Sequence, residues 1–192
     1  PVPTILNGAN HMAATLYTGS GSTQSISNAV NNISFQPDLV WVKDRTSAQD
    51  HKLTDSVRGT TKALISDTTG AETTDANGVT AFNSNGFSLG TGTRSYSDSN
   101  ADSYVGWQWL AGKGTTSTNT AGSLTSTVCV NATAGFSIVT YTGTIANATV
   151  GHGLGVAPSF YINMPRTGST IYNKNAWHTF LTSNQYCIAL NT

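Results

Sequence analysis

Charged side chains are scarce in this chain of 192 residues. Lys, Arg, Asp and Glu make up 9% of it, against about a quarter of an average soluble domain. The hydrophobic fraction of 38% is still large enough to form a core, so the low charge does not indicate disorder. The formal net charge is zero, and no basic face is available to neutralise phosphates. The composition therefore argues against nucleic acid as a partner.

Acidic side chains are absent from residues 113–192. All nine lie between Asp38 and Asp102, and Glu72 is the only glutamate, so residues 1–112 carry a net charge of −3 and the rest +3. Glycoside hydrolysis needs two carboxylates that converge across a cleft, which the second half cannot supply, and we predict that the protein is not an enzyme. The asymmetry favours head-to-tail or self-complementary contacts between copies, although drift of exposed loops explains it more simply.

Cysteine is also sparse, and metal-binding patterns are missing. Cys129 and Cys187 lie far apart in apolar, strand-like contexts, so we predict buried free thiols, with a disulfide as the alternative. The four histidines are scattered and form no ligand pattern. We therefore expect neither a metal nor a cofactor. No apolar run approaches the roughly 20 residues that span a membrane, so membrane insertion is not expected.

What the chain has in abundance is Thr, Ser and Asn, which number 31, 21 and 17. Thr suits a pleated surface, and Ser and Asn suit turns, so this balance favours strands over helices. Residues 39–42 form an apolar run typical of a core strand, and residues 104–110 alternate in the period of a strand. The one helix candidate, 48–65, contains Arg58-Gly59-Thr60-Thr61 and is poor helix material.

One pattern occurs twice along the chain. Tyr-Thr-Gly begins at Tyr17 and again at Tyr141, and each triplet is followed by a polar stretch, a proline (Pro37 or Pro158), an apolar run and an arginine. The triplets begin 124 positions apart and the prolines 121, which indicates a duplicated domain rather than a short solenoid repeat.

The chain divides into four parts on this basis. Residues 1–12 hold two prolines without periodicity and predict an extended arm that anchors or docks the protein. Residues 13–110 form the first unit, 111–126 a Gly/Ser/Thr linker, and 127–192 the second unit. The second unit lacks a counterpart to the last strands of the first. We expect a continuation of the chain or a neighbouring subunit to complete it.

Three short stretches resemble functional motifs, but we interpret each of them as a surface group, a loop or a turn. Asp50, His51, Asp55 and Ser56 lack the glycine pattern of a nucleophile elbow and are interpreted as surface or loop groups. The stretch 98–102 holds two aspartates but not the Glu and Gly of an EF-hand, so a solvated turn is favoured over a calcium site. The glycines of 151–155 precede a strand rather than a helix and predict a turn, not a phosphate-binding loop.

The aromatic side chains suggest either packing or sugar binding. Trp41, Trp107 and Trp109 lie on strands that are interpreted as core. Trp177 follows a polar loop and is the more plausible exposed ring. Stacked rings with nearby amides are typical of carbohydrate sites, although core or interface packing is favoured. The candidate glycan or interface contacts are Trp177, Tyr172, Asn173 and Asn175.

Six sequence blocks carry a family resemblance. In the first unit they are Phe35-x-Pro37-Asp38-Leu39-Val40-Trp41-Val42-Lys43-x-Arg45, Asp55-Ser56-Val57-Arg58-Gly59, Phe82-Asn83-Ser84-Asn85-Gly86-Phe87-Ser88-Leu89-Gly90 and Tyr104-Val105-Gly106-Trp107-x-Trp109. In the second they are Gly135-Phe136-Ser137-Ile138-Val139-Thr140-Tyr141-Thr142-Gly143 and Gly151-His152-Gly153-Leu154-Gly155-Val156-Ala157-Pro158. Together they resemble repeat domains of tailed-bacteriophage virion proteins of the tail-fibre or minor structural type. The resemblance spans about residues 13–180 and implies a concanavalin-like β-sandwich, with no catalytic residues to carry over.

These observations predict an all-β fold of two antiparallel β-sandwich or jelly-roll-like units from an internal duplication, preceded by an extended arm. The expected function is that of a virion structural protein in a tail fibre or surface appendage, assembled in the host cytoplasm. Its expected partners are other virion proteins through residues 1–12, further copies of itself with a trimer favoured, and a host surface glycan. The alternatives are a capsid decoration (head fibre) protein and a host-glycan-binding receptor module.

Overall fold

The computed structural model describes residues 5–92, 98–168, 173–183 and 186–192. Within them the chain forms fifteen strands and one 3₁₀ helix, Gly8–Asn10, and no α-helix. The prediction of an all-β fold is confirmed. Residues 48–65 contain two strands instead of a helix, as expected from their composition.

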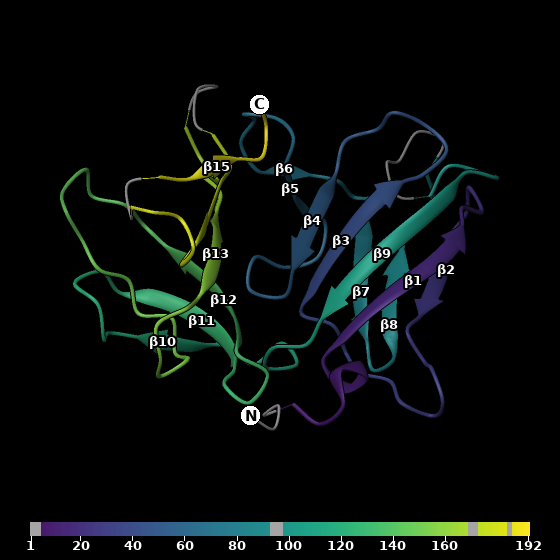
Figure 1. The fold of residues 1–192 in the computed structure, drawn as a ribbon. Helices are drawn as coiled ribbons and strands as arrows, with labels where there is room; N and C mark the ends of the chain where they lie inside the picture. The colour runs from purple at the N-terminus through teal and green to yellow at the C-terminus, as the bar shows by residue number, and fades with distance from the viewer. Residues whose placement is uncertain (1–4, 93–97, 169–172, 184–185) are drawn as a thin grey trace.

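The strands form four antiparallel sheets (Figure 1). We call β1–β9 the first unit and β10–β15 the second unit. In the first unit, a six-stranded sheet has the order β1 (Met12–Thr18), β9 (Ser103–Trp109), β3 (Leu39–Asp44), β4 (Lys52–Asp55), β5 (Lys62–Ile65) and β6 (Thr73–Thr74), and a three-stranded sheet has the order β2 (Gln24–Ser27), β8 (Gly86–Leu89) and β7 (Val79–Asn83). In the second unit, the sheets are β10 (Ser117–Asn119), β11 (Ser126–Asn131) and β12 (Phe136–Tyr141), and β13 (Phe160–Asn163), β14 (Asn175–His178) and β15 (Ile188–Ala189).

The core of the first unit lies between its two sheets. Alternate residues of β3 and β9 point inward, and they meet the inner face of the three-stranded sheet. The buried cluster consists of Ile26, Val40, Val42, Val79, Phe87, Leu89 and Tyr104. Gly106 faces the same space, where a Cβ atom would lie 3.1 Å from the Phe87 ring. A larger residue at position 106 would therefore have to displace a fully buried ring.

The buried carboxylate of Asp38 joins the two units at one end. Asp38 is fully buried directly before β3, and one oxygen accepts N–H bonds from Ala111 at 2.7 Å and Lys113 at 2.9 Å. The other accepts from the Gly114 N–H at 2.6 Å, the Ser56 hydroxyl at 2.7 Å and the Cys129 thiol at 3.4 Å. The positive φ angles of Lys113 and Gly114 turn their N–H groups toward the anion. The stretch 111–126, which composition marks as a linker, is thus tied down at its start and contains β10.

A second joint connects the units through Glu72. The Arg166 guanidinium donates from Nε and Nη2 to the two Glu72 carboxylate oxygens at 2.9 and 3.1 Å, and the Glu72 N–H donates to the Arg166 carbonyl at 2.9 Å. The fully buried Lys174 ammonium donates to the Gly70 carbonyl at 2.7 Å and the Pro165 carbonyl at 3.0 Å. Two of the three basic side chains beyond residue 112 therefore form hydrogen bonds that connect the second unit to the first.

We predict that Asp38→Asn destabilises the protein by about 2–4 kcal/mol. The substitution removes a buried charge and turns an amide N–H₂ toward backbone N–H donors, which leaves them unpaired. Urea unfolding followed by tryptophan fluorescence measures the change. Asp50→Asn, at a half-buried loop carboxylate, is the control and should shift stability by no more than about 0.5 kcal/mol. Equal midpoints for the two variants would contradict this role of Asp38.

The Glu72 joint should weaken in acid. Burial by itself would raise the pKa of Glu72, but the hydrogen bonds and charges of Arg166 and Arg58 outweigh it and lower the pKa. Because the folded-state pKa lies below the unfolded value of about 4.3, the stabilisation is complete above that pH and disappears as pH falls through the folded pKa.

The stability difference between the wild type and Glu72→Gln tests this joint. It should be largest at pH 7 and shrink below about pH 4. Urea titrations at a series of pH values measure it. A difference that stays constant down to pH 3 would show that the ion pair does not contribute.

Candidate binding cleft

The outer face of the six-stranded sheet is apolar where solvent would be expected. Across the sheet, Ala14 pairs with Trp107, Trp107 with Trp41, and Trp41 with Leu53. A second row places Met12 beside Trp109 and Trp109 beside Leu39. The three tryptophans are half-buried and point away from the core cluster.

The prediction that Trp41, Trp107 and Trp109 belong to the core is therefore wrong. The alternation of β9 correctly separates Val105, Trp107 and Trp109 from their neighbours. Period-two alternation defines two faces but does not say which one the second sheet covers. Here the covered face is that of Tyr104 and Gln108.

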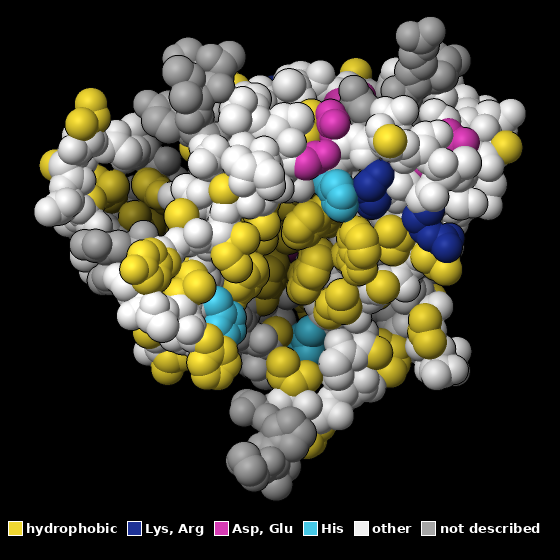
Figure 2. Space-filling view, turned by 45° about the horizontal axis from the view of Figure 1, so that its top comes forward, with side chains coloured by type: hydrophobic (Ala, Val, Ile, Leu, Met, Phe, Trp, Pro, Cys, Tyr) yellow, Lys and Arg dark blue, Asp and Glu magenta, His cyan; other side chains and the backbone are white. Residues whose placement is uncertain are grey.

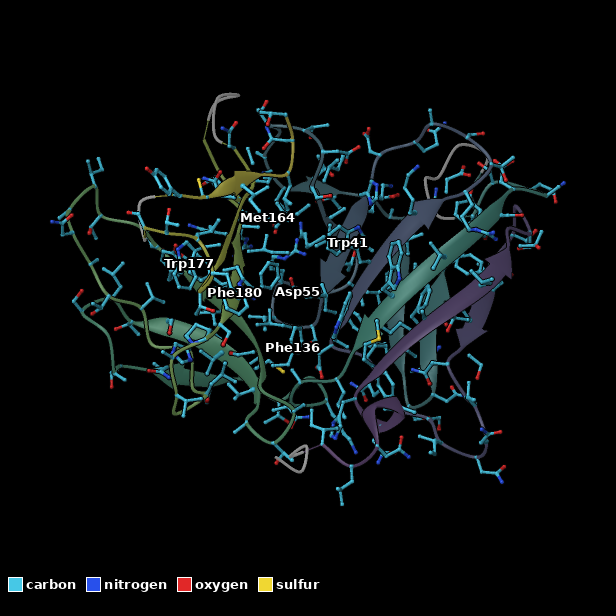
Figure 3. All side chains as sticks on the ribbon, viewed as in Figure 1. Trp41, Asp55, Phe136, Met164, Trp177 and Phe180 are labelled. Carbon is cyan, nitrogen blue, oxygen red and sulfur yellow. The ribbon has the colours of Figure 1, made fainter. Side chains whose placement is uncertain are left out.

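The second unit supplies the opposite wall of a cleft. Figure 3 shows Trp41 and Asp55 on one side of the space between the units, and Phe136, Met164 and Phe180 on the other. The space-filling view shows a hollow there, bordered by hydrophobic side chains (Figure 2). The Trp109 and Phe136 rings stack across the boundary of the units, with centroids 6.3 Å apart at 23°. We call this hollow the interunit cleft.

A histidine is hydrogen-bonded to Trp41, the tryptophan of the sheet that faces the cleft. The Trp41 Nε1–H donates to His51 Nδ1 at 3.0 Å, and the two rings meet edge to face. Burial lowers the pKa of His51, so the imidazole is neutral at pH 7. Because Nδ1 accepts a hydrogen bond, the single proton of the neutral ring resides on Nε2. Trp41 and His51 together present an aromatic surface with one N–H donor at its edge.

Three charged side chains beside the cleft, Asp55, Arg58 and Glu72, are paired with one another. Arg58 Nε donates to the Asp55 carboxylate at 2.5 Å, and its Nη1 donates to Glu72 at 3.1 Å. The other Asp55 oxygen accepts the backbone N–H groups of Val57 and Arg58. Both side chains of the Asp55–Arg58 pair are almost completely buried. Both Asp55 oxygens therefore accept hydrogen bonds from within the chain.

The described residues that the sequence singled out for ligand contact have partners within the second unit. Trp177 is half-buried and stacks on Tyr161, with ring centroids 5.3 Å apart, on the side of β14 opposite His178. Asn175 lies half-buried in β14, and the exposed Asn173 accepts a hydrogen bond from Asn191 at 3.2 Å. Tyr172 lies outside the described residues. Trp177 is thus not the exposed ring that its loop context predicted.

The Ser, His and Asp residues close in sequence are held apart. His51 contacts Trp41, Asp55 contacts Arg58, and Ser56 donates to Asp38. Each of them is bonded to a residue outside this group, and the interpretation of Asp55 as a surface or loop group is wrong, because it lies buried in β4.

The remaining polar motifs also have structural partners. The interpretation of Asp98 as part of a solvated turn is wrong, because it is buried and accepts from the Ser20 N–H and from Gln24. Burial raises the pKa of Asp98. In the described part of the chain, no group of three or more His, Cys, Asp and Glu residues could hold a metal ion. Bends occupy residues 153–156, and the chain then leads into β13.

Both cysteines are free, and only one is buried. Cys129 is buried at the joint formed by Asp38, where burial raises the pKa of its thiol. Cys187 is exposed, so the prediction of burial is wrong for it. Among the described residues no helix is long and apolar enough to cross a membrane.

Searches of curated proteins and of solved structures return no match to the chain. A family model, described as a domain of unknown function, DUF7483, matches residues 7–192. That match covers both units, the interunit cleft and both joints between the units. The chain therefore belongs to the DUF7483 family.

Proposed function

We propose that the chain is a non-enzymatic structural and binding module of a tailed-bacteriophage virion. In this proposal it forms part of a tail fibre or surface appendage and contributes to assembly and host attachment. The observation that carries the proposal is an aromatic cleft between two joined β units, in which the acidic groups are already paired with arginines. Such a cleft is suited to holding a ligand without reacting with it. The resemblance of the six sequence blocks to virion repeat domains supports the same role.

A duplicated sandwich architecture also belongs to this proposal. In each unit the repeated proline leads into a strand, Pro37 into β3 and Pro158 into β13. The two strands are used differently, because β3 is central in a six-stranded sheet and β13 is at the edge of a three-stranded one. We propose that the units descend from one jelly-roll-like ancestor and have diverged in how their sheets are completed.

The second unit offers a surface for assembly. Its described residues expose several large apolar side chains, which single-chain domains rarely leave in contiguous groups. They include Ile145, Val156, Phe160, Tyr161, Phe180, Tyr186 and Ile188. We propose that part of this surface is covered in a homo-oligomer, with a trimer favoured, and that the N-terminal arm contacts other virion proteins.

The role of the arm is tested by removing residues 1–6, which precede the 3₁₀ helix Gly8–Asn10. His11 and Met12 belong to the folded chain, because the Leu110 N–H donates to the His11 carbonyl and β1 begins at Met12. We predict that deletion of residues 1–6 leaves the thermal unfolding midpoint unchanged but reduces incorporation into particles at least about tenfold. Immunoblots of purified particles measure incorporation. Normal incorporation would contradict the anchoring role of the arm.

A capsid decoration protein is the alternative, and copy number separates the two. Quantitative mass spectrometry of purified particles should give tens of copies or fewer for an appendage and hundreds for capsid decoration. Immunogold labelling of intact particles locates the chain. Absence of the chain from particles would contradict the proposed function in both forms.

A further inference from the structure

We propose that the interunit cleft binds a neutral oligosaccharide, with one sugar ring packed on Trp107 and a sugar hydroxyl bonded to the His51 Nε2–H. This proposal deepens the proposed role in host attachment and rests on it. Three properties of the cleft suit such a ligand: a partly exposed aromatic surface, a hydrogen-bond donor beside it, and arginines that are already paired with carboxylates.

The uncovered surface is centred on Trp107. On one side its cross-strand neighbour is Trp41, whose ring meets it edge to face at 74° with centroids 6.2 Å apart. On the other side its neighbour is Ala14, an exposed residue whose methyl group is too small to cover an indole. Met12 and Leu16, on the same face of β1, are 39% and 65% exposed and extend the apolar margin.

An aromatic surface of this kind fits the face of a sugar ring. The C–H groups of a pyranose form an apolar face, while its hydroxyl groups project from the ring edge and require hydrogen-bond partners. Indole rings supply a large apolar area at a low cost in side-chain entropy. A purely hydrophobic peptide would not need the polar group that the cleft holds beside these rings.

His51 is that polar group, and its tautomer is fixed. The hydrogen bond from Trp41 occupies Nδ1, which leaves the Nε2–H as a donor. The nearby Lys43 is less suitable, because its ammonium already donates to the carbonyls of Asp44, Ser47 and Gln49 at 2.9, 3.4 and 2.7 Å. One neutral donor beside an aromatic surface is suited to a hydroxyl group.

The charge distribution selects a neutral ligand. Arg58 is bonded to Asp55 and Glu72, and Arg166 is bonded to Glu72. A carboxylate or sulfate group bound here would compete with Asp55 and Glu72 for these arginines, and a pair broken in this way would leave a desolvated carboxylate without its counter-charge. A neutral oligosaccharide leaves the pairs intact.

The test is a glycan panel followed by titration calorimetry with the full chain. The panel holds neutral hexose and N-acetylhexosamine oligosaccharides together with sialylated and uronate-containing ones. The wild type should bind neutral members, and the tightest of them should also quench tryptophan fluorescence. Trp107→Ala should weaken that binding at least about tenfold and His51→Ala about threefold to tenfold, whereas Trp107→Tyr should recover part of the loss.

Tyr141→Ala is the matched control. It removes an exposed ring from the far end of β12 relative to Phe136, on the opposite face of that strand by alternation. Its affinity should equal that of the wild type, and circular dichroism should show that all four variants are folded. If Trp107→Ala does not fold, the affinities of His51→Ala and Trp107→Tyr for the oligosaccharide test the proposed site instead.

Binding confined to sialylated or uronate-containing glycans would overturn the proposal, as would no binding of any panel member at millimolar concentration. Equal losses in Tyr141→Ala and His51→Ala would also overturn it. A chain that is present in particles but binds no glycan would refute this inference and leave the appendage role intact. A glycan-binding chain that is absent from particles would refute the appendage role instead.

Discussion

The structure depends on one buried carboxylate. Asp38 gathers three backbone N–H groups from the segment that leaves β9, a hydroxyl from the β4 turn and a thiol from β11. A buried anion is costly unless it is fully hydrogen-bonded, and here the donors come from both units. The same bonds that satisfy the charge therefore set the direction in which the chain enters the second unit. Without them, residues 111–126 would be the flexible linker that their composition describes.

The second constraint is the pairing of charges across the units. The acidic residues lie in the first unit and the last two cations in the second, and in the folded chain Arg166 meets Glu72 while Lys174 meets the backbone of the same loop. The charge asymmetry thus serves, at least in part, to join the units to each other. With a joint at Asp38 and another at Glu72, the outer face of the large sheet is placed opposite the second unit, and the interunit cleft results.

The sequence predicted the positions of some strands correctly, but it did not predict the burial of several individual residues. Alternation in 104–110, the apolar run at 39–42 and the Thr-rich composition correctly indicated strands. The poor helix sequence around Arg58-Gly59 correctly indicated that 48–65 is not a helix. The predicted burial was wrong for Asp98 and Cys187, because the burial of a residue depends on segments distant in sequence. Asp98 is buried against residues 20–24, and Cys187 is exposed beside β15.

The candidate site shows most clearly which features the sequence predicts and which depend on tertiary packing. The sequence by itself determined the all-β class and which tryptophans share a face, because these follow from composition and from the two-residue period of a strand. Only the tertiary structure decided that Trp41, Trp107 and Trp109 lie outside the core and that Trp177 is stacked and half-buried. A strand has two equivalent faces until a second layer covers one of them. In this chain the three-stranded sheet covers the Tyr104 face, and the tryptophans are left on the outer face, where Trp41 faces the cleft and Trp109 stacks on Phe136.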